Sequence, residues 1–162
     1  MQKIKGVTAL LAIVLLALSS SAAVESRSTS RTEILDAMNR ERAAKGLRPL
    51  KLNAELSLAA SDRIRDMFAK NYFAHVSPDG LDPFVWAEQR GYDYRLIGEN
   101  LAVGFRGQAV VDGWMRSRGH RENILQRGFQ EVGIAIVEGA PRRGYRGPTV
   151  VAMYGTERAP RW

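Results

Sequence analysis

Two apolar segments near the end of the chain limit the possible fold more than any other feature of the sequence. Residues 131–138 read EVGIAIVE and residues 148–154 read PTVVAMY, so apolar side chains occupy both alternating sets of positions. Because successive side chains of a strand point to opposite faces, both faces of these strands need apolar cover. The Gly, Pro and Arg residues of 139–147 predict a loop that joins the two strands as a hairpin.

Helical patterns in the first two thirds of the chain supply that cover. Apolar residues recur at three- and four-residue steps, and Asn53 is a candidate N-cap. A less regular strand is expected at 96–103. Helices followed by strands predict an α+β domain, with a small antiparallel sheet between helical layers. The expected helical segments are residues 32–45, Asn53 to Phe68, Asp82-Pro83 to Arg90, 110–115, and a turn at 120–126.

The first residues have the pattern of an export signal. Lys3 and Lys5 precede an uncharged apolar run, and small residues end at Ala23. We therefore expect a signal peptide at 1–23, a flexible lead at 24–32, one domain at 33–157 and a tail at 158–162. An uncleaved N-terminal anchor is the alternative. No later segment is long and apolar enough for a transmembrane span, so we expect a secreted, periplasmic or cell-envelope protein.

Composition excludes several kinds of site. The 162 residues contain no cysteine and two histidines, with a formal net charge of +7. A disulfide scaffold, a thiolate zinc site and a thiol nucleophile are excluded, as is a three-histidine metal site within one chain. The length suits a single domain, which we expect to be a monomer.

Both histidines lie outside the apolar stripes. His75 stands in a turn-rich segment, and His120 follows Gly119. Between them, Glu99 and Asn100 interrupt an apolar strand, and a buried carboxylate needs a partner. From spacing alone, ordinary structural hydrogen bonding is the simpler interpretation of all four side chains.

At these positions the sequence resembles the CAP superfamily, also called SCP domains, in its short bacterial form. The resemblance covers about residues 34–154 and implies an α-β-α sandwich, in agreement with the pattern of helices and strands. The motifs that carry it are Asn39 with Arg42, Gly46 to Leu50 (GLRPL), Phe73 to Gly80 (FAHVSPDG), Gly98 to Ala102 (GENLA), Trp114 with 119–125 (GHRENIL), and Val132 to Ile134 (VGI).

The resemblance implies a cleft lined by two histidines and two acids. His75, Glu99 and His120 match three of these four positions, whereas the second acid of the family is replaced by Ser117. The sequence does not choose among possible substitutes, which are Asp79, Asp112 and Glu122.

Two functions follow as expectations. Imidazoles and a carboxylate suit a divalent ion, with zinc as the default, so His75, Glu99 and His120 are candidate metal ligands. Binding should be reversible and weaken at acid pH. The alternative is a metal-dependent, peptidase-like hydrolase with Glu99 as general base, although HExxH and GxSxG motifs are lacking. A glycosidase pair of Glu99 with Glu122 or Glu88 stays open.

The favoured function is a binding module rather than an enzyme. Arg142, Arg143 and Arg146 in the 139–147 loop suit an anionic envelope component or lipid, unless they only aid solubility. Asn100 and Ser117 complete the candidate binding residues. We expect no nucleic-acid partner. Tyr72, Tyr92 and Tyr94 are candidates for the cleft rim, whereas Trp86 and Trp114 are expected in the core.

Overall fold

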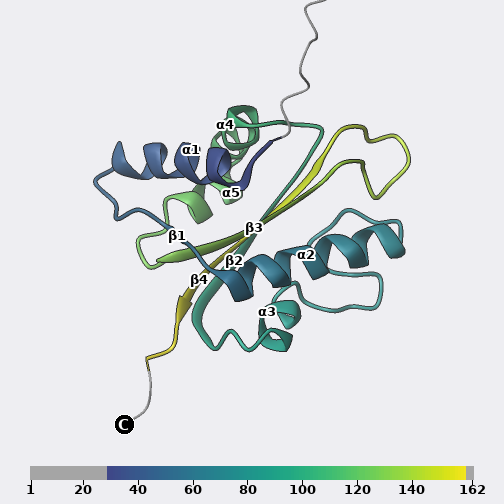
Figure 1. Ribbon diagram of the computed structural model, residues 1–162, viewed down its shortest axis with the longest axis horizontal. Helices are drawn as coiled ribbons and strands as arrows, with labels where there is room; N and C mark the ends of the chain where they lie inside the picture. Colours follow the sequence, from purple (N-terminus) through teal and green to yellow (C-terminus); the bar gives the residue numbers. More distant parts are fainter. Residues whose placement is uncertain (1–28, 160–162) are drawn as a thin grey trace, which may run out of the picture.

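The computed structural model of the protein describes residues 29–159, which form three layers (Figure 1). A four-stranded sheet lies between α1, α4 and α5 on one face and α2 and α3 on the other. The α+β class is therefore as predicted, whereas the predicted signal peptide lies outside the described residues. The elements are α1 (Arg31–Ala43), β1 (Lys51–Leu52), α2 (Ala54–Ala69), α3 (Val85–Gln89), β2 (Tyr94–Val103), α4 (Gln108–Arg116), α5 (Arg118–Ile124), β3 (Glu131–Val137) and β4 (Thr149–Glu157).

The sheet has the strand order β1-β3-β4-β2. β3 and β4 form the predicted antiparallel hairpin, and β2 adds to the far side of β4, also antiparallel. The predicted antiparallel sheet is present in β2, β3 and β4, and β1 makes it a mixed sheet because it runs parallel to β3. Two residues are too few to show a period, so the sequence pattern missed β1. β1 is held in place by hydrogen bonds from the backbone N–H groups of Lys51 and Asn53 to the carbonyl oxygens of Gln130 and Val132.

The two faces of the sheet have separate apolar cores, as the hairpin sequence predicts. Ile134 packs in the cluster shared with α1, α4 and α5, whereas Ala135 packs in the cluster shared with α2 and α3. The α2 helix lies very close to β3, because a Cβ at Gly133 would meet the backbone of Leu56 at 2.0 Å. Glycine at this position is what allows that approach.

Most predicted helices are present, with changed ends. Asn53 caps α2 by accepting from the Leu56 N–H group, as expected. Asp82 does not cap α3: its carboxylate accepts from the N–H group of Phe84 in a turn, and the helix begins at Val85. The first helix begins at Arg31, inside the segment expected to be a lead. Within residues 29–159, no helix combines the length and apolar content needed to cross a membrane.

Candidate functional site

The candidate site lies at β2, which is an edge strand of the sheet. Side chains alternate between the faces of a strand, so the neighbours Glu99 and Asn100 point into different layers. The carboxylate of Glu99 contacts Arg63 of α2, and the amide of Asn100 contacts the His120 carbonyl of α5. One dipeptide on an edge strand thus connects both helical layers.

The first half of the site is the loop after α2, which carries His75. The ring Nδ1 of His75 lies 2.8 Å from Glu99 Oε1, and Glu99 Oε2 lies 3.1 Å from the Nε of Arg63. The Glu99 side chain is 1% exposed, whereas that of His75 is 52% exposed. Both carboxylate oxygens of Glu99 are therefore occupied by protein donors, and the accessible group is the imidazole.

The second half of the site is α5, which carries His120. The Nδ2 group of Asn100 donates to the His120 carbonyl and to Tyr154 Oη, each at 3.0 Å. Asn123 Nδ2 donates to Asn100 Oδ1 at 2.8 Å and to the Glu99 carbonyl at 3.0 Å. Asn100 is fully buried, so it holds the backbone of the site and is not placed to contact a ligand.

The two imidazoles lie near each other and are tilted. Their ring centroids lie 6.3 Å apart with an angle of 55° between the planes. Burial lowers the pKa of His120, and the positive charge of a protonated His75 lowers it further. The His120 ring is therefore held neutral at pH 7, which is the form that binds a metal ion.

The three acids that could substitute for Ser117 each have another partner. Ser117 joins α4 to α5. Asp79 pairs with Lys70, Asp112 accepts from Gln108, and Glu122 accepts from Arg118. Among residues 29–159, no three His, Asp or Glu side chains are arranged to hold one metal ion.

Arg63 is a residue of the candidate site that the sequence pattern did not predict. Its guanidinium donates to Glu99, to Tyr72 Oη and to the carbonyl oxygens of Ala74 (2.5 Å) and His75 (2.6 Å). The sequence carries a signal for this residue, because Arg63 interrupts the apolar stripe of its helix. In the structure its side chain is fully buried. A buried arginine in such a stripe needs acceptors, and here they come from the segment that ends at His75.

The basic loop is near the histidine segment. Arg142, Arg143 and Arg146 are exposed in the β3–β4 loop, which projects from one end of the sheet (Figure 1). The ring of Tyr145 lies 5.7 Å from that of Phe73, two residues before His75. The loop therefore packs beside the segment that carries the first histidine.

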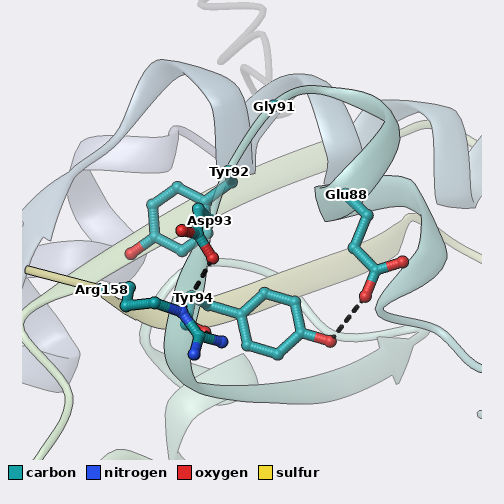
Figure 2. A pocket seen from close by; sticks show the side chains of 6 residues that line it. All are labelled: Glu88, Gly91, Tyr92, Asp93, Tyr94 and Arg158. Carbon is teal, nitrogen blue, oxygen red and sulfur yellow. Dashed lines mark hydrogen bonds and ion pairs between the residues drawn. The ribbon is translucent and has the colours of Figure 1, made fainter. Parts of the chain in front are cut away.

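Two of the candidate rim tyrosines lie elsewhere. Tyr92 and Tyr94 line a separate hollow of about 350 Å³, together with Glu88, Asp93 and Arg158 (Figure 2). The hydroxyl of Tyr94 donates to Glu88 at 2.9 Å, so Glu88 is held at this hollow and not beside the histidines. Trp86 and Trp114 are buried as predicted: Trp86 packs with α2, and the indole N–H of Trp114 donates to the Leu101 carbonyl. Tyr72 is buried and supports Arg63.

A family model matches most of this chain. The sequence pattern of the cysteine-rich secretory protein family, abbreviated CAP, matches residues 35–154. This range contains both histidines, Glu99 and the whole of β1, β2 and β3.

Individual proteins are similar to most of this chain. YkwD of Bacillus subtilis (strain 168) is 38% identical over 121 residues, which are 74% of this chain and 47% of that protein. The chain therefore spans about half the length of this relative. An extracellular SCP-domain protein of Bacillus anthracis has a TM-score of 0.66 at 24% identity, over 78% of this chain and 40% of that one. An outer surface protein of Borrelia burgdorferi has a TM-score of 0.70 at 17% identity, over 78% of this chain and 92% of that one.

Proposed function

This chain belongs to the cysteine-rich secretory protein (CAP) family, and we propose that it is an exported binding module whose paired histidines take a divalent metal ion. The neighbouring rings of His75 and His120 are the observation that supports the proposal. Export is supported by the N-terminal pattern and by two proteins of the same fold, one extracellular and one at the outer surface. Zinc is the default ion for a site built from imidazole ligands.

The spacing of the two rings supports a zinc ion held by two protein ligands. Two imidazoles on one tetrahedral zinc have ring centroids roughly 5–6 Å apart, close to the 6.3 Å seen here. Glu99 is not proposed as the third ligand, because both of its oxygens bind protein donors. Water or a partner would complete the shell, so we expect affinity well below that of a structural zinc site.

Titration calorimetry with zinc tests this proposal. Wild type should bind one zinc, and the His75→Ala, His120→Ala double variant should bind none. Asp79→Asn is the matched control, because this exposed acid lies four residues from His75 and pairs with Lys70. Equal zinc binding by wild type and the double variant would show that the metal proposal is wrong.

The basic loop supplies the second part of the proposed function. Arg142, Arg143 and Arg146 are exposed, and the ion pairs of residues 29–159 include none of the three. Three such cations on one loop favour an anionic component of the cell envelope. The experiment is co-sedimentation with anionic vesicles and, in a separate arm, with acidic wall polymer.

The loop variant should separate this activity from the metal site. Replacing the three arginines by glutamine should abolish co-sedimentation with whichever material, vesicles or wall polymer, binds the wild type. Higher salt should weaken wild-type binding. The double histidine variant should still bind, because its loop is intact. Binding that is insensitive to salt and to the loop variant would contradict the proposed role of the loop.

Hydrolysis is the second candidate, supported by the pairing of a carboxylate with an exposed imidazole. In this geometry His75, and not the buried Glu99, is the group placed to act as a general base on water. Incubation with a peptide library in the absence of zinc tests it, because the free ring nitrogen of His75 cannot bind zinc and accept a proton at the same time. Cleavage that disappears in His75→Ala would favour the enzyme, and no cleavage by wild type would exclude peptidase activity.

A further inference from the structure

We infer that Glu99 and Arg63 are positioning residues for His75: Glu99 selects the ring tautomer that leaves Nε2 free, and Arg63 holds both the carboxylate and the His75 segment in place. The zinc consequence rests on the proposed function above, whereas the tautomer does not. The inference assigns Glu99 a role different from that of metal ligand or base.

The first step concerns the contact between Glu99 and the ring. An ionised carboxylate can only accept hydrogen bonds, so Glu99 Oε1, 2.8 Å from His75 Nδ1, requires the proton on Nδ1. In the neutral ring the lone pair is then on Nε2. Because the carboxylate is almost fully buried while the ring is half exposed, Nε2 is the nitrogen available for binding.

The second step concerns what fixes the carboxylate. Arg63 is fully buried, and its Nε donates to Glu99 Oε2 at 3.1 Å. The two charges therefore compensate each other in a site that excludes water, where an unpaired carboxylate would be costly. The rings of Trp86 and Tyr72 lie 4.7 and 5.3 Å from the guanidinium carbon and confine it further.

The third step connects the same guanidinium to the backbone of the loop. Arg63 Nη2 donates to the carbonyl oxygens of Ala74 and His75. One side chain of α2 thus fixes both the acceptor for the His75 ring and the backbone that carries the ring. Arg63 therefore fixes the backbone of His75 and, through Glu99, the tautomer of its ring. Partners of a metal-binding histidine usually act in this way.

Long-range ¹H–¹⁵N NMR of the imidazoles in the metal-free protein tests the inference. At about pH 8, where imidazoles are neutral, the wild-type His75 should be the Nδ1–H tautomer. In Glu99→Gln a substantial fraction should change to Nε2–H, because the amide can also donate. Wild-type His75 in the Nε2–H form would overturn the inference, and this measurement needs no variant.

Arg63→Lys and Arg42→Lys form the matched pair. Lysine keeps the charge at either buried position but cannot reproduce the guanidinium contacts. The tautomer ratio of His75 should change in Arg63→Lys and stay unchanged in Arg42→Lys, although both variants lose stability. An equal change in both would mean general loosening and would overturn the role of Arg63.

Zinc affinity provides the second readout. Glu99→Gln and Arg63→Lys should each weaken zinc binding about 10-fold, as expected for partners of a ligating histidine, with Arg42→Lys near wild type. Zinc binding with no effect of either variant would overturn the inference and leave the proposed function intact. A wild-type protein with the expected tautomer and no zinc binding would support the inference about Glu99 and contradict the proposed metal-binding function.

Discussion

Two arginines, one in each helical layer, are fully buried, and they differ in the groups that accept their hydrogen bonds. Arg42 of α1 donates only to neutral carbonyl oxygens, those of Arg48, Ile124, Gln126 and Phe129. Arg63 of α2 donates to a carboxylate, a phenol and two carbonyls. Burial lowers the pKa of Arg42, and the nearby Tyr154 only partly opposes this.

The difference shows which buried charge serves the candidate site. The carbonyls around Arg42 belong to the last residue of α5 and to the loops that precede β1 and β3, so this side chain joins these segments and contributes to stability. The acceptors of Arg63 are concentrated on Glu99 and on the segment that ends at His75. Two equally buried arginines therefore have different roles, a structural one in the first layer and a positioning one in the second.

Arg63→Met should have the largest effect. It leaves the buried carboxylate of Glu99 without its counterion, which typically costs about 3–5 kcal/mol. The free energy of unfolding from urea titration is the measurement. Adding Glu99→Gln in the same chain should restore part of the loss, because no charge then needs a partner. Additive losses in the double variant would contradict the coupling.

Arg42→Met should cost less, about 2–3 kcal/mol, because it removes hydrogen bonds without leaving a charge behind. Two of its hydrogen bonds, to the carbonyls of Ile124 and Phe129, are buried, and the other two are only partly buried. The same urea titration measures it. A loss greater than that of Arg63→Met would reverse the comparison between the two layers.

Tyr72→Phe should cost about 1–1.5 kcal/mol, because its hydroxyl accepts from Arg63 and donates to Asp66. Tyr154→Phe is the counterpart near Arg42 and should cost about 0.5–1 kcal/mol, since Asn100 keeps a second acceptor at the His120 carbonyl. Thermal denaturation of both variants compares them. Equal losses would mean that Arg63 does not depend on Tyr72.

The smallest effect should be a pH dependence. Because the pKa of His120 is lowered in the folded state, the unfolded state binds more protons as pH falls below about 6.5, the ordinary histidine value. Stability should therefore rise with pH through this window. We expect His120→Gln to reduce the slope of the free energy of unfolding against pH, measured by urea titrations between about pH 5 and 7. An unchanged slope would mean that the pH dependence comes from other groups.

The sequence predicted the hairpin and the two-sided packing because both depend on local periodicity. The alternation of residues 131–138 and 148–154 determines which side chains face each layer, and Asn53 determines where α2 begins. The pattern missed β1, because two residues have no period, and misplaced the start of α3. The expected rim tyrosines Tyr92 and Tyr94 also lie at another hollow, since exposure depends on distant packing.

By itself, the sequence determined the residue types of the candidate site and the family to which the chain belongs, because the motifs around His75, Glu99 and His120 are local. Only the tertiary structure decided what each side chain contacts. On the edge strand β2, the side chains of Glu99 and Asn100 point into opposite layers. Arg63 donates a hydrogen bond to Glu99, the carboxylate that the sequence pattern made a candidate metal ligand. The physical reason is that a buried charge must find its partner in space, 36 residues away in this chain.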